Sequence, residues 1–247
     1  MGRINRPTVG LGSMVARIKK EDLHLARRNE ILDVAQRLIA TKGYEQMTIA
    51  DILGELHISK GAFYHYFDSK ADLLEALIGK MREEAIHVLG PILDDPGLNA
   101  LQKIQRWFDA SAQWKTARKD YLLSLLQVWY HDDNAVVRQK LRTDSLAWIS
   151  PSLTRVIHQG MREGTFATLF PDHIAHVVFS LLYELSDRLA ARILSGRSDD
   201  EVLADARAET AAFTDAIERT LGTPPGSLSL IDPEMLKEWY AAPVSAA

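Results

Sequence analysis

The sequence predicts an all-α protein, and two features carry this prediction. Apolar side chains recur every three or four positions along most of the 247 residues, which is the period of an amphipathic helix. Glycine and proline separate these stretches, and no segment shows the alternation of a half-buried strand. Because 47% of the residues are hydrophobic, the chain can bury a substantial core. We expect an N-terminal three-helix domain followed by a larger helical domain.

The composition excludes several classes of protein. The chain has no cysteine, which rules out disulfides, cysteine nucleophiles and thiolate metal sites. It has neither an apolar run long enough to span a membrane nor a cleavable leader, so we expect a cytoplasmic protein without membrane contact. Residues 1–80 carry 12 basic and 10 acidic side chains, whereas the rest of the chain carries 17 basic and 23 acidic ones. This asymmetry favours a first domain that faces a polyanion.

Residues 1–24 are rich in arginine and lysine and lack apolar periodicity. They predict a flexible basic arm, which either stays solvated or reaches into a groove of a nucleic acid. The first helix follows, with Ile31, Ala35 and Ile39 at helical spacing, and it ends at Gly43.

The segment from Thr48 to Leu74 predicts a helix-turn-helix. Thr48 can cap a short helix with an apolar stripe, which stops at a turn over residues 57–59. Ser59 can cap a second helix that places Phe63 and Phe67 one turn apart on its buried side. The outward residues of this second helix are Lys60, Gly61, Ala62, Tyr64, His65 and Tyr66.

These outward groups predict DNA binding. A soluble surface rarely gathers several rings without a ligand, and hydroxyl and ammonium groups are donors that phosphate oxygens accept. Ser69 can cap the next helix with Lys70 in its first turn, where the helix dipole disfavours a cation unless a phosphate is bound nearby. A purely structural three-helix unit is the alternative interpretation.

The residues ILDVAQRLIATKGYEQMT, FYHYF and SKADLL resemble the DNA-binding domain of the TetR family of bacterial regulators, over about residues 27–75. The resemblance implies a DNA-binding domain at residues 25–70, whose recognition helix brings Lys60, Gly61, Ala62 and His65 close to base edges. It also implies phosphate contacts from Thr48, Tyr64, Tyr66 and Lys70. Ala50, Leu53 and His57 depart from the family's usual residues, and losing a basic side chain at Ala50 makes the operator harder to predict.

The rest of the chain predicts further helices, which would form an effector-binding and dimerisation domain at residues 71–221 followed by a C-terminal tail at residues 222–247. The fourth helix should end at Gly90 and Pro91. Later helices are expected at residues 97–116, 119–130, 134–164, 171–195, 199–221 and 233–240. Pro151 should kink or break the helix that contains it.

The last two long helices carry wide apolar stripes with small residues beside them. In TetR-like proteins the corresponding pair forms a four-helix bundle with its copy, and a pseudo-palindromic operator demands a two-fold dimer. The resemblance therefore implies a homodimer, with interface candidates Val178, Leu182, Leu185, Phe213 and Ile217. Ordinary monomer core is the alternative for both stripes.

The middle helices contain many large rings. The resemblance implies that they enclose a pocket for a small-molecule effector, with candidates Trp107, Trp114, Trp129, Tyr130 and Trp148. Aromatic residues at this spacing are also ordinary core.

No catalytic residue, cofactor or metal is predicted. His173 and His176 could face one metal from a single helix, but no further ligand is predicted in reach. We expect a repressor that a small molecule releases from double-stranded operator DNA. The alternatives are a regulator without an effector and a helical enzyme that uses the central pocket.

Overall fold

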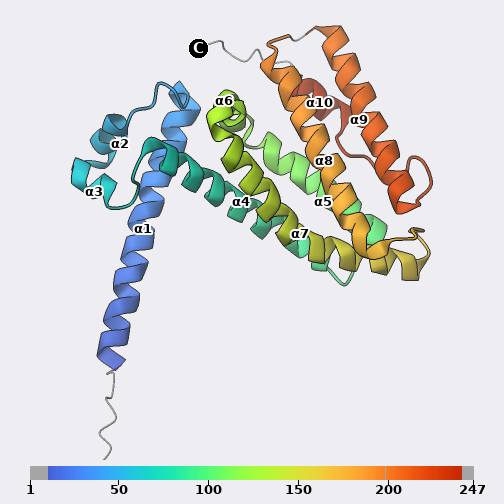
Figure 1. Ribbon diagram of the computed structural model, residues 1–247, viewed down its shortest axis with the longest axis horizontal. Helices are drawn as coiled ribbons and strands as arrows, with labels where there is room; N and C mark the ends of the chain where they lie inside the picture. Colours follow the sequence, from blue (N-terminus) through green and yellow to red (C-terminus); the bar gives the residue numbers. More distant parts are fainter. Residues whose placement is uncertain (1–10, 198, 241–247) are drawn as a thin grey trace, which may run out of the picture. The chain divides into compact units, whose positions relative to one another are not determined.

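The computed structural model describes residues 11–197 and 199–240, which form helices joined by short connections (Figure 1). This described part contains no β-strand, so the predicted all-α fold is confirmed. The chain divides into two compact units, with the boundary between Leu77 and Ile78. No helix among the described residues is long and apolar enough to cross a membrane.

The first unit consists of three helices and the start of a fourth. They are α1 (Leu11–Lys42), α2 (Ile49–Leu56), α3 (Lys60–Tyr64) and α4 (Lys70–Asp94), the last of which continues into the second unit. Its core is built from the apolar faces of these helices and of the short segments between them. The most deeply buried large side chains are Ile31, Leu32, Ile39, Met47, Ile52, Phe63, Phe67 and Leu73. This core supports the short helices α2 and α3, which are too short to be stable in isolation.

The predicted basic arm differs from the structure. Residues 11–24 belong to α1, and residues 1–10 of the predicted arm lie outside the described residues. The segment has no apolar stripe, and among its described side chains Leu23 is 71% exposed. Its residues are mostly good helix formers, so they can extend a helix that the buried turns from Ile31 onward have already nucleated.

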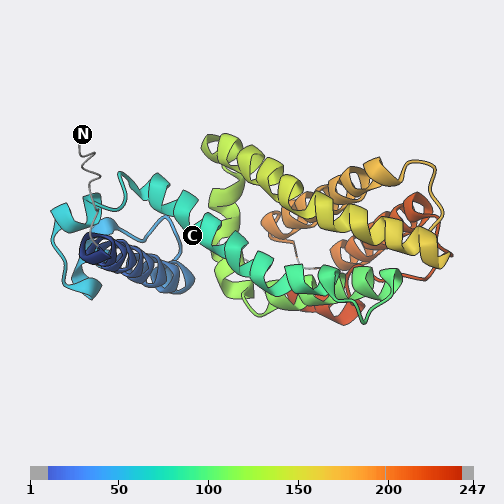
Figure 2. The ribbon, with the colours of Figure 1, turned by 90° about the horizontal axis from the view of Figure 1, so that it is seen from below.

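The second unit consists of the remaining helices. They are α5 (Ala100–Thr116), α6 (Lys119–Tyr130), α7 (Ala135–Glu163), α8 (Pro171–Leu194), α9 (Asp200–Leu221) and α10 (Pro233–Tyr240), with a 3-10 turn at Asp132–Asn134. Helices α7, α8 and α9 lie side by side, as Figure 1 and Figure 2 both show. Their inward faces and that of α5 share one apolar core.

Two prolines are placed inside helices rather than at their ends. Helix α4 runs through Gly90 and Pro91 to Asp94, and α7 runs through Pro151 without a break. The predicted end of α4 was therefore wrong, and of the kink or break predicted at Pro151 the break does not occur. Pro91 lies near the end of its helix, and both prolines are exposed, so the carbonyl left without an N–H partner can be hydrated.

The C-terminal tail is largely part of the second unit. Leu228, Leu230, Leu236 and Tyr240 are buried in its core, and the Tyr240 hydroxyl donates to the Leu189 carbonyl at 3.1 Å. Residues 241–247 of the predicted tail lie outside the described residues.

Candidate nucleic-acid interface

The two helices of the helix-turn-helix begin with side-chain caps. The Thr48 hydroxyl accepts the Asp51 N–H at 3.2 Å, and the Ser59 hydroxyl accepts the Ala62 N–H at 3.2 Å. Between the helices, His57 adopts a left-handed conformation with φ of 52°, where glycine is the usual residue. Its amide N–H donates to the Leu53 carbonyl, which ends α2 and turns the chain toward α3.

Helix α3 separates buried rings from exposed polar groups. Phe63 is fully buried and packs against Phe67 with the ring centroids 5.7 Å apart. Of the six outward positions predicted for this segment, four residues are exposed and two are partly exposed. The exposed residues are Lys60, Gly61, Tyr64 and His65, and the partly exposed ones are Ala62 and Tyr66. The surface therefore offers ammonium, hydroxyl and imidazole groups on one short segment.

Gly61 is not required by the packing of the protein itself. A Cβ added there would meet only the Ser59 hydroxyl oxygen, at 4.0 Å. The open space beside this glycine lies on the exposed side of α3, where a ligand could approach the backbone closely.

Lys70 is held at the start of α4 by its neighbours. Its ammonium donates to the Glu45 carbonyl at 3.2 Å and lies 4.2 Å from the centre of the Tyr44 ring. The Tyr44 hydroxyl donates back to the Lys70 carbonyl at 3.2 Å. Partial burial lowers the pKa of Lys70, while burial and Glu45 raise the pKa of Tyr44 to about 12. The Lys70 ammonium is therefore partly desolvated, and an anion bound nearby would stabilise its charged form.

Thr48 differs from the other predicted phosphate contacts, because its hydroxyl already has partners. It donates to the Asp51 carboxylate at 2.7 Å, and that carboxylate also pairs with Lys42 at 2.8 Å. The hydrogen bond from Lys42 and those from Thr48 lower the pKa of Asp51 to about 2. A fully ionised carboxylate here disfavours a nearby phosphate, so Thr48 acts first as a helix cap.

The sequence-based prediction missed two side chains that α1 adds to this surface. His24 packs against Tyr66 with centroids 4.6 Å apart and against His65 at 5.5 Å, and the Arg28 guanidinium lies 5.0 Å from the centre of the Phe67 ring. His24 and Arg28 are four positions apart, so they share one face if this segment is helical. The sequence did not predict a helix at His24, because the apolar stripe of the first helix begins only at Ile31.

Comparison with known proteins identifies this domain. The sequence profile described as "Bacterial regulatory proteins, tetR family" matches residues 31–77. The chain is 40% identical over 65 residues to the HTH-type transcriptional repressor KstR2 of Rhodococcus jostii (strain RHA1), a match over 23% of this chain and 32% of that protein. Residues 31–77 are therefore similar to the DNA-binding domain of the TetR family.

Solved structures resemble the fold over more of the chain. A TetR-family regulator from Pectobacterium atrosepticum superposes with a TM-score of 0.59 at 20% identity, covering 82% of this chain and 98% of that one. A protein from Saccharomonospora viridis, solved in complex with choline, gives a TM-score of 0.56 at 24% identity and covers 78% and 96% of the two chains. The first curated relatives are matched over only 32% to 42% of their own length.

The five predicted effector residues of the second unit lie in different surroundings, and all are partly exposed. Trp107 packs beside Phe108, and Trp114 lies under the Arg118 guanidinium at 4.5 Å. The indole N–H groups of Trp107 and Trp114 are buried and have no acceptor among the described residues.

The other three effector candidates have contacts of their own. The Tyr130 hydroxyl donates to Asp187 at 2.6 Å, and burial together with this carboxylate raises the pKa of Tyr130. The Trp129 carbonyl accepts a hydrogen bond from Arg138. A Cβ at Gly90 would lie 3.5 Å from the Trp148 ring, so this ring packs closely against the backbone of α4.

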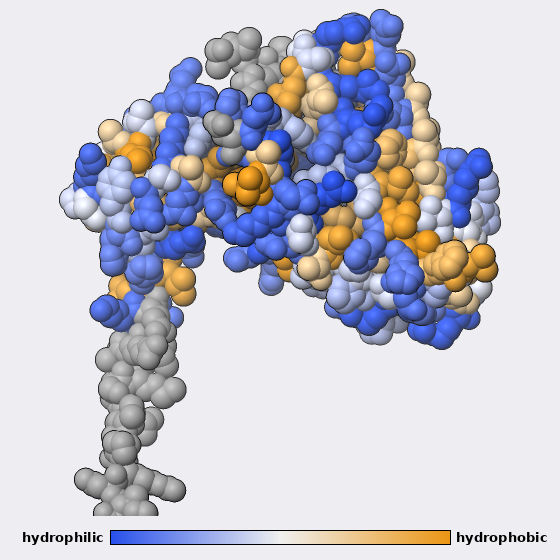
Figure 3. Space-filling model, viewed as in Figure 1, coloured by the Kyte–Doolittle hydropathy of each residue, from blue (hydrophilic) through white to orange (hydrophobic). Residues whose placement is uncertain are grey.

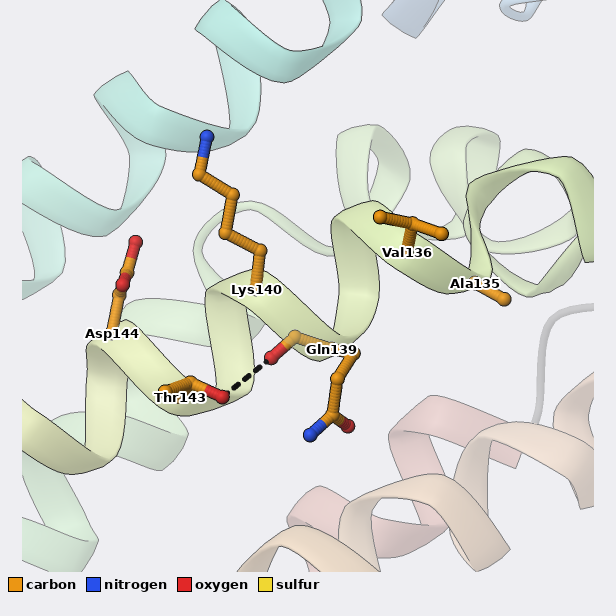
Figure 4. A pocket seen from close by; sticks show the side chains of 6 residues that line it. All are labelled: Ala135, Val136, Gln139, Lys140, Thr143 and Asp144. Carbon is orange, nitrogen blue, oxygen red and sulfur yellow. Dashed lines mark hydrogen bonds between the residues drawn. The ribbon is translucent and has the colours of Figure 1, made fainter.

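A hollow of about 530 Å³ lies along the first half of α7, and none of those five residues lines it. It is lined by Ala135, Val136, Gln139, Lys140, Thr143 and Asp144. Figure 4 shows Lys140 and Asp144 on one side of α7 and Gln139 on another, and the Thr143 hydroxyl donates to the Gln139 carbonyl at 3.0 Å. Asp144 also pairs with Arg82 at 3.3 Å, so two of the unit's helices are connected at the edge of this hollow.

The predicted dimer residues fall into two groups. Val178, Leu185 and Ile217 are 3% exposed or less within a single chain, so they pack into its own core, and the interface role predicted for them stays a prediction. The apolar stripes of α8 and α9 are wide enough to contact other helices of the same chain as well as a second copy. The sequence alone could not show which residues of a stripe face which partner. Leu182 and Phe213 are partly exposed and stay available to a second copy.

The histidines at the start of α8 do not converge with other ligands. Both His173 and His176 are exposed, and the neighbouring Asp172 contacts His158 at 2.7 Å instead. Among the residues that the structure describes, no three His, Cys, Asp or Glu side chains are grouped to hold a metal ion.

Proposed function

We propose that this chain is a transcriptional repressor that binds a pseudo-palindromic DNA operator as a homodimer and is released by a small molecule. One observation carries the DNA-binding part. Helix α3 turns Lys60, Tyr64 and His65 to the outside while Phe63 holds it on the core. A helix-turn-helix whose second helix carries such groups is built to enter the major groove. The relatives named as regulators and repressors support the same proposal.

The contacts divide into two kinds. Lys60, Gly61, Ala62 and His65 would lie near base edges and decide sequence preference. Tyr64, Tyr66 and Lys70 would hold phosphates and fix the register of the protein on the duplex. Thr48 is the weakest phosphate candidate because its hydroxyl caps α2.

The test is selection of operator sequences from a random duplex library by the full chain, followed by binding measurements at several salt concentrations. We expect Lys70→Ala to weaken all selected sequences about equally and to reduce the slope of log affinity against log salt by about one unit. Lys60→Ala and His65→Ala should instead change which bases are preferred. Lys237→Ala, at an exposed lysine on α10, is the matched control. Failure of the unchanged protein to enrich any sequence contradicts the proposal.

Dimerisation would use the exposed sides of α8 and α9. Val177 is 44% exposed, Leu182 and Phe213 are partly exposed, and hydrophobic side chains gather over the first half of α8 and the loop before it (Figure 3). The alanines Ala204, Ala208, Ala211 and Ala212 on α9 are exposed and would let a second helix approach closely.

Light scattering tests the dimer. Phe213→Glu should yield a folded monomer, because a charge buried in an interface without a partner costs several kcal/mol. Arg207→Glu, at an exposed position of the same helix, is the control for a new negative charge. A monomeric unchanged protein contradicts the dimer, and a dimeric Phe213→Glu variant places its interface elsewhere.

The effector would bind in the second unit among Trp107, Trp114, Trp129, Tyr130 and Trp148. The two buried indole N–H groups support this part of the proposal, because an unpaired buried donor costs about 1–3 kcal/mol that a ligand acceptor would recover. The effector must favour the non-binding conformation by about 2.7 kcal/mol to weaken DNA binding a hundredfold.

The effector is sought by tryptophan fluorescence and release of selected DNA, with choline as the first compound because the S. viridis neighbour was solved with it. Trp114→Phe keeps a ring but removes the donor, so it should lose the response to an effector and keep operator affinity. A screen in which no compound quenches fluorescence or releases DNA supports a regulator without an effector. Turnover of a compound without DNA binding would support an enzyme.

A further inference from the structure

Three rings from two separate segments meet on the proposed DNA-binding surface. The His24 ring on α1 lies 4.6 Å from the Tyr66 ring, with an interplanar angle of 43°. It also meets the His65 ring edge-on, with centroids 5.5 Å apart and planes at 79°. His65 and Tyr66 meet each other at 5.1 Å and 79°. Each ring therefore contacts both of the others.

The rings of His65 and Tyr66 have few other contacts that fix their orientation. Helix α3 has only five residues and ends at Tyr64, and its one buried side chain is Phe63. His65 and Tyr66 follow that end, and no side-chain hydrogen bond holds either ring within the part of the chain that the structure describes. The core anchor Phe67 fixes the backbone beyond them, but it does not set the direction of the exposed His65 ring.

Helix α1 contacts this segment on two consecutive turns. Four positions after His24, the Arg28 guanidinium lies 5.0 Å from the centre of the Phe67 ring. One face of α1 therefore follows the segment from His65 to Phe67. His24 lies outside residues 31–77, which the TetR-family profile matches, so this contact belongs to the N-terminal extension of α1.

We propose that His24 is a positioning residue for base recognition, which holds the His65 ring in the orientation that reads the operator. This inference rests on the proposed DNA-binding function. Edge-to-face and tilted ring contacts restrict both partners to a narrow range of orientations. An exposed side chain that is already ordered loses less conformational entropy when it binds, so the packing increases affinity and sharpens base preference. His24 acts through its ring, and a charge on its side chain is not required.

Three substitutions of His24 separate this role from a direct phosphate contact. His24→Ala removes the ring, His24→Phe keeps a ring without donors or charge, and His24→Lys keeps a donor and a charge without a ring. We expect His24→Ala and His24→Lys to weaken binding of the selected operator by about two- to tenfold, the range for one ring pair. Both should also relax the same base position that His65→Ala relaxes. His24→Phe should retain affinity and base preference.

A double-mutant cycle gives a sharper measurement. If His24 acts through His65, the double variant His24→Ala/His65→Ala should bind no more weakly than His65→Ala alone. In the protein without DNA, the ring resonances of His65 and Tyr66 should shift in His24→Ala and not in Leu25→Ala. Leu25 is the control because it lies next to His24 on α1 and is exposed.

The outcomes are distinct. Retained binding in His24→Lys with loss in His24→Phe overturns the proposal in favour of a phosphate contact by His24. Unchanged base preference in His24→Ala, with the unchanged protein binding its operator, overturns it outright. If the unchanged protein selects no operator, the proposed function fails instead, while the ring resonances still report whether the contact exists.

Discussion

Both units contain helices with side-chain caps, but the second unit also has hydrogen bonds between segments more than a hundred positions apart. In the first unit the starts of α2, α3 and α4 are capped by Thr48, Ser59 and Ser69, each bonded to an N–H three positions ahead. In the second unit, hydrogen bonds also hold the C-terminal segment against helices that lie far from it in the sequence. Gln105 and Ser229 exchange two hydrogen bonds across 124 positions, and the Trp239 indole donates to the Thr116 hydroxyl across 123.

This difference predicts how each unit responds to the loss of one contact. Helices α2, α3 and α4 of the first unit each carry their own cap, so loss of one cap should loosen one helix. The second unit depends on a C-terminal segment that returns to α5, α8 and α9, so one disturbed contact there should affect the whole core. The predictions below compare the two units, from the largest expected effect to the smallest.

The largest effect is expected at the end of α9. Gly222 has φ of +68°, and a Cβ there would lie 1.9 Å from the Ala167 carbonyl oxygen. Gly222→Ala should lower the free energy of unfolding by about 3 kcal/mol, because both the left-handed conformation and the clash are costly. Gly226→Ala is the control, since φ is +80° there but no atom lies within 4 Å. Urea unfolding should show a much smaller loss for that control, and equal losses contradict the role of the close approach.

The next effect concerns the buried carboxylate of Glu218, which is 3% exposed. It accepts the Gly226 N–H at 3.0 Å and the Leu228 N–H at 2.8 Å, and so fixes the start of the C-terminal segment. Glu218→Gln turns one acceptor into a donor and should destabilise the protein by about 2 kcal/mol. The midpoint of urea unfolding measures this change. Glu234→Gln, at an exposed glutamate of α10, should leave the midpoint unchanged.

A cap in the first unit should matter less. Thr48→Ala removes the acceptor for the Asp51 N–H and should cost about 1 kcal/mol, whereas Thr48→Ser should preserve the cap. Hydrogen exchange of the α2 amides measures the local loss. A loss as large as that of Gly222→Ala would abolish the distinction between the two units.

Gly61 gives an effect of opposite sign on stability. Because a Cβ there meets nothing closer than 4.0 Å, Gly61→Ala should stabilise the protein by about 0.5–1 kcal/mol through its better helix propensity. The same variant should bind the selected operator more weakly if DNA approaches this backbone closely. Thermal unfolding and operator binding are measured on the same sample. Unchanged operator affinity would remove Gly61 from the proposed contact surface.

The smallest effect is a pH dependence of the α2 cap. The pKa of Asp51 is lowered to about 2 by its hydrogen bonds to Lys42 and Thr48, compared with 3.8 for the ordinary group. Ionised Asp51 therefore stabilises the folded state above pH 3.8, and this contribution is lost as the pH falls toward 2. The difference in stability between the unchanged protein and Asp51→Asn should shrink over that range. If the difference in stability between the two proteins does not change with pH, the charge of Asp51 does not contribute to the cap.

Local features of the candidate site were predictable from the sequence. Helical spacing and capping residues act within three or four positions, so Thr48, Ser59 and the buried pair Phe63 and Phe67 were identified correctly. The exposed positions of Lys60, Tyr64 and His65 follow from the same spacing. The ring of His24 could not be found in this way, because its contact with His65 depends on how α1 crosses a segment far along the chain.

The sequence by itself determined the helical class, the helix-turn-helix and its caps, because these depend on interactions between near neighbours. Only the tertiary structure decided which side of each amphipathic helix is internal. Val178 and Ile217 are buried in their own chain while Leu182 and Phe213 remain partly exposed, although all four belong to the same two stripes. The tertiary structure also packed Leu228, Leu230, Leu236 and Tyr240 of the C-terminal segment into the core. An apolar stripe predicts that one face of a helix will be buried. Which other helix buries it depends on long-range packing, and the local spacing of residues does not determine that packing.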